Sequence, residues 1–182
     1  MKFLTSIASL SMAAALAIAS PIAKASDNLY ALRVSSKDAQ LDGKYLSVFD
    51  NVVGIFPGRQ TLFVTASESS KKGCVELHLH PTGIIDHALG LVGEGVKELH
   101  DIANPASSPG ADWTSFAMNS AGDPGEPNLG SLSYTAKGGR WVVFPAKAGG
   151  EWKVTWLDGS SITTQNYMPI DLVYEGAMTI SQ

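Results

Sequence analysis

The sequence is poor in cysteine and in charged residues. Cys74 is the only cysteine among 182 residues, so an intramolecular disulfide is excluded and the fold must depend on its apolar core. Because Cys74 begins an apolar run, we expect its side chain to be buried. Charged residues make up 16% of the chain, below the roughly 25% of an average soluble domain.

The chain also lacks a basic patch and a second long apolar run. It has 13 lysines and arginines against 17 aspartates and glutamates, and its densest basic segment is the pair Lys71-Lys72. Nucleic acids need clustered cations, so we expect no nucleic-acid partner. Residues 176–182 form no hydrophobic tail of the kind a lipid-anchor signal requires. After removal of its N-terminal segment, the protein is therefore predicted to have no membrane anchor.

Motifs of nucleophilic catalysis and of dinucleotide binding are missing. No Gly-x-Ser-x-Gly sequence occurs, which excludes the strand-turn-helix elbow of the α/β-hydrolases. The glycines at 90, 93 and 95 lack the order of a dinucleotide fingerprint. These absences favour a non-enzymatic protein over an enzyme, and we assign no catalytic residue and no required cofactor.

The N-terminus has the pattern of a cleavable signal peptide. Lys2 supplies a positive charge, residues 3–19 are apolar or small, and Ala17-Ile18-Ala19 has the small residues of a cleavage site. A second such site, Ala23-Lys24-Ala25, allows cleavage as late as residue 25. We therefore predict a signal peptide over 1–19, a single domain over 20–182, and a secreted protein of the extracellular space or cell wall.

The mature chain consists of short segments rich in β-branched and aromatic residues, separated by Gly, Pro, Asp and Asn. This texture predicts about ten to twelve short strands in one compact, antiparallel, all-β domain. A β-trefoil-like barrel and a β-sandwich both remain open, because they differ in strand order and not in strand content. The strands expected with the clearest patterns are 29–34, 45–49, 52–56, 61–65, 75–80, 113–118, 129–134, 141–144, 152–156 and 170–174.

One segment, 95–102, leaves a short helix as an alternative to a strand. Val92, Val96, Leu99 and Ile102 recur at intervals of three to four residues, which is a helical spacing. The nearby glycines oppose a helix, since each costs about 1 kcal/mol relative to alanine.

All four histidines lie between positions 78 and 100, and two of them alternate with Glu76 along a predicted strand. Glu76, His78 and His80 would project from one face of that strand, with His87 and His100 further along the chain. Imidazole and carboxylate groups are common ligands of divalent transition metals, so these five residues are candidate metal ligands. The alternative is the solvated face of a half-exposed strand.

The same segment partly resembles the first motif of the cupins, in which a glycine precedes a His-x-His pair and an acid follows. The corresponding residues here are Gly73, His78, His80 and Asp86. This resemblance implies a metal-binding secreted protein or enzyme.

Tryptophans mark one face of another predicted strand. Trp152 and Trp156 share that face with Val154, while Glu151, Lys153 and Thr155 share the opposite face. Exposed indole rings would stack on sugars and indicate a carbohydrate-binding module, whereas buried rings would belong to the core.

Short segments spread over most of the mature chain resemble a family of secreted fungal cell-wall proteins that includes the phialide cell-wall protein and IgE-binding antigens. Family members carry several cysteines, whereas this chain has one. The resemblance implies a secreted, cell-wall-associated, non-enzymatic β-protein, an antigen or host-directed effector, whose partner is a cell-wall polysaccharide or an extracellular protein. The matching segments are residues 30–35, 43–46, 62–64, 141, 150–154, 158–159 and 169–172.

Overall fold

The computed structural model describes residues 27–80, 83–120, 129–135, 138–146 and 149–180. The predicted signal peptide, 1–19, and the later cleavage site at 25 lie outside these residues. The described chain forms fourteen strands joined in one antiparallel sheet, which confirms the all-β, single-domain prediction. None of its helices is long and apolar enough to cross a membrane.

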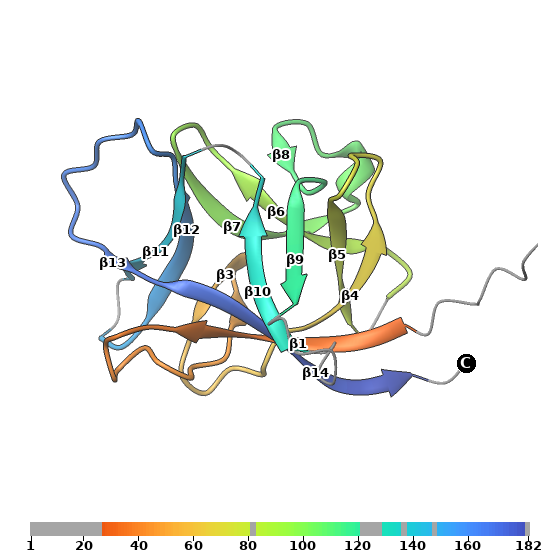
Figure 1. Ribbon diagram of the computed structural model, residues 1–182, viewed down its shortest axis with the longest axis horizontal. Helices are drawn as coiled ribbons and strands as arrows, with labels where there is room; N and C mark the ends of the chain where they lie inside the picture. Colours follow the sequence, from red (N-terminus) through yellow and green to blue (C-terminus); the bar gives the residue numbers. More distant parts are fainter. Residues whose placement is uncertain (1–26, 81–82, 121–128, 136–137, 147–148, 181–182) are drawn as a thin grey trace, which may run out of the picture.

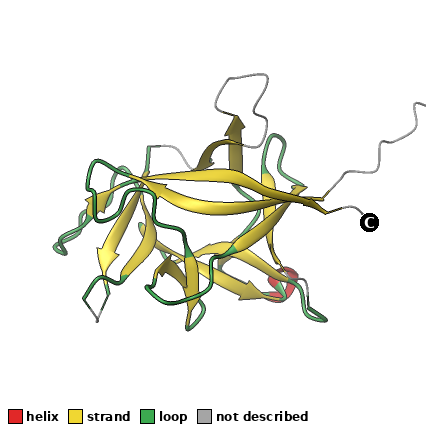
Figure 2. Cartoon of the chain, turned by 90° about the horizontal axis from the view of Figure 1, so that it is seen from below, coloured by secondary structure: helices red, strands yellow, loops and turns green. Residues whose placement is uncertain are grey.

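Six of the strands close into a barrel. β1 (Asp27–Ser35) pairs with β4 (Phe63–Glu68), β4 with β5 (Val75–His80), and β5 with β9 (Phe116–Ser120). The ring continues from β9 to β10 (Leu129–Tyr134) and to β14 (Asp171–Ile180), which pairs with β1. Figure 2 shows the long β1–β14 pair crossing the molecule. Closure leaves these six strands without a free edge in the ring.

Three hairpins cover one end of the barrel: β2–β3, β6–β7 and β11–β12. One strand of each hairpin pairs with the other two, because β3, β7 and β12 are joined in all three combinations. Figure 1 shows β3, β11 and β12 gathered beside the barrel strands β4, β5, β9 and β10. The bounds are β2 Ser47–Phe49, β3 Val52–Ile55, β6 His87–Val92, β7 Val96–Ala103, β11 Arg140–Pro145 and β12 Trp152–Leu157.

A six-stranded barrel capped by three hairpins is the architecture of a β-trefoil. Each third of the chain contributes two barrel strands and one hairpin, running from β1 to β4, from β5 to β9 and from β10 to β14. Two further strands are short additions: β8 (Ala111–Asp112) pairs with β6, and β13 (Met168–Pro169) pairs with β11. The sequence left a trefoil-like barrel and a sandwich open. The strands form one closed sheet, which fits the trefoil-like barrel and not the sandwich.

The core fills the barrel and the space beneath the hairpins. Leucine and valine side chains from all three thirds are fully buried, and Cys74 is buried as expected. Trp156 lies edge to face against Trp141 and Tyr134, with ring centroids 5.2 and 5.4 Å apart. The Trp141 indole nitrogen donates a hydrogen bond to the carbonyl oxygen of Leu132 at 2.8 Å, so its polar atom is satisfied inside the core.

The helix alternative over 95–102 is wrong: this segment is β7. Gly93 and Gly95 have φ angles of 117° and 69°, and they form the turn that brings β7 back against β6. In this register Leu91 faces Leu99, and both side chains are buried. Cross-strand pairing on both edges of β7 therefore outweighs the local three-to-four spacing. The one helical element described is a 3-10 turn, Pro105–Ser107.

Close contact between β3 and β12 depends on Gly54. This residue pairs with Lys153, and a Cβ atom at position 54 would collide with the carbonyl oxygen of Trp152. A glycine inside a strand commonly marks such a close approach of two backbones.

We predict that Gly54→Ala destabilises the fold by about 1–3 kcal/mol, because β3 or β12 must move to admit the methyl group. Chemical unfolding of the variant measures this loss. Gly149→Ala is the matched control, since no atom lies within 4 Å of its added Cβ and its φ is not positive. Equal stability of the two variants would contradict the close approach.

Candidate functional site

The predicted histidine row lies on β5, but its carboxylate partners stand apart. His78 Nδ1 is 2.8 Å from Asp86 Oδ1, and His78 Nε2 is 3.6 Å from Glu76 Oε2. The two carboxylates therefore approach opposite sides of one imidazole ring and do not converge on a common point. The ring also lies edge to face against Trp113, with centroids 6.3 Å apart.

The other histidines form further separate pairs. His87 Nδ1 lies 2.6 Å from Asp101 Oδ1, and His100 Nε2 lies 3.3 Å from Glu98 Oε2. His80 and His87 line a shallow depression together with Asp101. Within the described residues, no three His, Cys, Asp or Glu side chains are arranged to hold a metal ion. The five candidate ligands are thus distributed over β5, β6 and β7 and do not form one coordination site among the described residues.

The tryptophan face of β12 points into the protein. Trp156 is 5% exposed and belongs to the core, so it lacks the free ring face that stacking on a sugar requires. Trp152 is partly buried and packs against the same core cluster.

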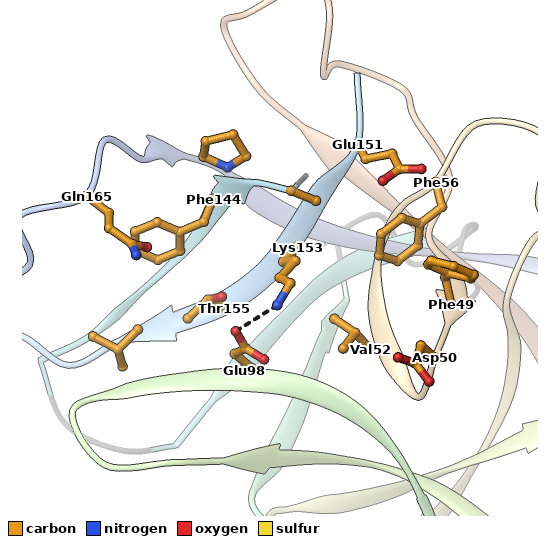
Figure 3. A pocket seen from close by; sticks show the side chains of 13 residues that line it. Phe49, Asp50, Val52, Phe56, Glu98, Phe144, Glu151, Lys153, Thr155 and Gln165 are labelled. Atoms are coloured by element: carbon orange, nitrogen blue, oxygen red, sulfur yellow. Dashed lines mark hydrogen bonds and ion pairs between the residues drawn. The ribbon is translucent and has the colours of Figure 1, made fainter. Parts of the chain in front are cut away.

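The opposite face of β12 borders a cleft of about 440 Å³ where the three hairpins meet. This volume is within the range of roughly 300–1,000 Å³ typical of ligand pockets. Residues from β3, β7, β11 and β12 line it, and Figure 3 shows their side chains. Because β3, β7 and β12 pair with one another, the lining residues are held by backbone hydrogen bonds from three distant parts of the sequence.

An ion pair lies at the centre of the cleft. Lys153 Nζ is 3.2 Å from Glu98 Oε1, and the other oxygen of this carboxylate is 3.3 Å from His100 Nε2. Figure 3 places the Lys153–Glu98 pair between Phe144 on one side and Phe56 on the other. Glu98 is therefore fixed by two cationic or hydrogen-bonding partners, one for each oxygen.

Thr155 lies beside this pair and has a buried, unsatisfied hydroxyl. It stands directly opposite Glu98 in the β7–β12 register and is 1% exposed. Its Oγ1 makes no hydrogen bond to any described residue. An unpaired buried hydroxyl costs about 1–3 kcal/mol. Trp156 Nε1 and Asp158 Oδ1 also have no hydrogen-bond partner among the described residues, but Thr155 is the one of these three residues that lines the cleft.

Aromatic side chains and two acids form the rim. Phe49 and Phe56 lie edge to face with centroids 5.7 Å apart. Asp50 and Asn51, with φ of 52° and 61°, form the two-residue turn between β2 and β3 and place Asp50 at the cleft edge. Positive φ at both positions is the requirement of a type I′ hairpin turn, which Asp and Asn tolerate well. Glu151 lies beside Phe56 in Figure 3.

Sequence reasoning assigned Glu151, Lys153 and Thr155 to one strand face but did not identify this site. The alternation of polar residues with Trp152 and Trp156 was the available signal. The partner residue Glu98 is 55 positions from Lys153, so no local pattern connects them.

A second polar cluster surrounds Asp112 of β8. Its carboxylate accepts hydrogen bonds from the Tyr134 hydroxyl at 2.6 Å and from the Ser115 hydroxyl at 2.7 Å. Lys71 donates to the same carboxylate at 3.2 Å and to the Ser115 hydroxyl at 2.5 Å. Ser115 is 4% exposed, and its hydroxyl donates a hydrogen bond to Asp112. The hydroxyl is therefore a structural group and not an accessible nucleophile.

Partial burial would raise the pKa of Asp112, but the hydrogen bonds from Tyr134, Ser115 and Lys71 outweigh it and lower the pKa to about 2. Burial and the hydrogen bond to Asp112 raise the pKa of Tyr134. The cluster therefore holds Asp112 ionised and Tyr134 protonated over the physiological pH range.

The chain matches no family model, no curated protein and no solved structure at a significant level. Its class is defined by its own fold and site: a single-domain β-trefoil with a ligand-sized cleft at the junction of its three hairpins.

We predict that Asp112→Asn lowers the free energy of unfolding by about 1–2 kcal/mol near pH 6. The folded pKa is below the unfolded value, so this contribution is present above about pH 4 and is lost as pH falls through 2. Urea unfolding across pH 2–7 measures the difference, with the exposed Asp171→Asn as control. A difference that is constant with pH would contradict the assignment.

Proposed function

We propose that the protein is a secreted, non-enzymatic protein of the cell wall or extracellular space. It binds its partner through the cleft where the three hairpins meet. The partner is a cell-wall polysaccharide or an extracellular protein, one group of which enters the cleft. The N-terminal signal pattern and the resemblance to secreted fungal cell-wall proteins support the location. The unpaired hydroxyl of Thr155 is the observation that carries the binding role.

The arrangement of the cleft favours binding over catalysis. A nucleophilic hydroxyl needs a base within hydrogen-bond reach, and Thr155 Oγ1 has no such partner among the described residues. The charged groups at the centre, Lys153 and Glu98, are paired with each other, and the second oxygen of Glu98 lies 3.3 Å from His100 Nε2. Lys153 can donate hydrogen bonds to a ligand and Glu98 can accept them, while the strands hold both side chains in place.

The cleft is lined by both apolar and polar side chains, which suits a partner that is neither fully apolar nor fully charged. Phe49, Phe56 and Phe144 provide apolar surface, and Gln165 adds a side-chain amide on the side of Phe144. Such a combination of apolar walls and a few fixed polar groups is typical of specific ligand sites.

We predict that Thr155→Val raises the stability of the free protein and weakens binding. Valine keeps the shape of the side chain and removes the unpaired hydroxyl, so the gain should be about 1 kcal/mol. Thermal unfolding measures the first effect. Co-sedimentation of the mature protein with insoluble chitin, chitosan or β-1,3-glucan, and pull-down of secreted proteins, measure the second.

Thr135→Val serves as the control at an exposed threonine, because the Thr135 hydroxyl does donate a hydrogen bond, to the Ser115 carbonyl oxygen at 3.1 Å. Its loss should not stabilise the protein. If Thr155→Val is no more stable than the wild type, its hydroxyl is satisfied in the free protein and the proposal loses its basis. Undiminished binding by this variant would place the interaction outside the cleft.

A further inference from the structure

We propose that the cleft binds an amino-sugar unit of a polysaccharide, a pyranose ring that carries a free ammonium group. This inference rests on the proposed function and specifies the chemistry of the partner. It follows from three properties of the cleft: an excess of carboxylates, the exposed ring of Phe49 beside one of them, and the unpaired hydroxyl of Thr155.

The charge of the cleft favours a cation. Asp50, Glu98 and Glu151 line it, and Lys153 is the one cationic side chain among the described lining residues. The Lys153 charge is neutralised by Glu98 at 3.2 Å. No described residue forms an ion pair with Asp50 or Glu151. A ligand ammonium beside either acid would be attracted to it, whereas a uronate would be repelled.

An exposed aromatic ring next to one of the acids strengthens this preference. Phe49 lies near Asp50 in Figure 3 and is 43% exposed, whereas Phe56 beside Glu151 is 6% exposed and offers little ring surface. The negative face of an aromatic ring attracts cations, and the apolar face of a pyranose ring packs against it. The guanidinium carbon of Arg59 is 4.3 Å from the Phe49 centroid, so one face of this ring is already covered and a ligand would pack against the other. Arg59 itself does not line the cleft.

Hydrogen-bonding groups are spread across the cleft in the way a polyhydroxyl ring requires. Thr155 offers a free hydroxyl beside the Lys153–Glu98 pair, and Gln165 offers an amide on the far side of that pair. An alkyl ammonium, such as a lysine side chain, would use the carboxylates but leave Thr155 and Gln165 without partners. The distribution of polar groups therefore favours the sugar over a protein side chain.

The test compares the glucosamine trimer with the N-acetylglucosamine trimer and cellotriose, which differ from it in the substituent at C2, and with trigalacturonic acid, an acidic trimer that differs also in linkage and ring configuration. Binding to the secreted mature chain is measured by calorimetry, and the site is located by NMR shifts of the Glu98, Lys153 and Thr155 amides. We expect the glucosamine trimer to bind at least about tenfold more tightly than the other three. We also expect its affinity to fall as salt is raised.

Glu151→Gln should weaken glucosamine binding about three- to tenfold and leave cellotriose binding unchanged. Glu94→Gln is the matched control, because Glu94 is an exposed acid in the β6–β7 turn outside the cleft. Equal affinity for the acetylated or neutral trimer, or tighter binding of a lysine-containing peptide, would overturn the amino-sugar inference alone. If no trimer binds, this inference fails as well, while the Thr155→Val results decide the proposed function independently.

Discussion

The mutual pairing of β3, β7 and β12 is the constraint on which the rest of the structure depends. These strands come from three separate thirds of the chain, and each pairs with the other two. The junction is close enough that position 54 admits only a glycine without displacement of the Trp152 backbone. Because non-local pairings of this kind are formed at a high entropic cost, the apolar core beneath them must supply most of the compensating free energy.

The junction also explains why a cleft exists at this place. On the inner side of β12, Trp156 packs against Trp141 and Tyr134, and this packing fixes the strand. On the outer side, Lys153 and Thr155 are carried by the same backbone and face Glu98 of β7. Side chains held by a buried strand lose little freedom when a ligand binds, so the cleft is preorganised by the core below it.

Local patterns in the sequence predict the strands well and their partners poorly. The strict alternation of residues 75–80 and the composition of 129–134 match β5 and β10 at both ends. Those patterns arise from side chains within one strand, so they can be read locally. The segment 95–102 was ambiguous because its helical spacing competes with turn glycines, and only the pairing of β7 with β6, β3 and β12 settles it as a strand.

The histidines that suggested a metal site do not converge with their carboxylates on one point among the described residues. His87 faces Asp101 on the neighbouring strand, His78 faces Asp86 just before β6, and His100 lies beside Glu98 of its own strand. Spacing along a strand shows which side chains share a face, but it does not show which carboxylates a neighbouring strand brings to them.

The residues that line the candidate cleft, unlike the histidines, form no recognisable motif in the sequence. Glu98, Lys153 and Thr155 are ordinary polar residues on the outward faces of their strands. They become a site because three hairpins converge on them and because one buried hydroxyl is left without a partner. Of the three buried polar atoms without a partner among the described residues, only Thr155 Oγ1 belongs to a residue that lines the cleft, so the proposal of a ligand depends on Thr155 and not on any of the histidines.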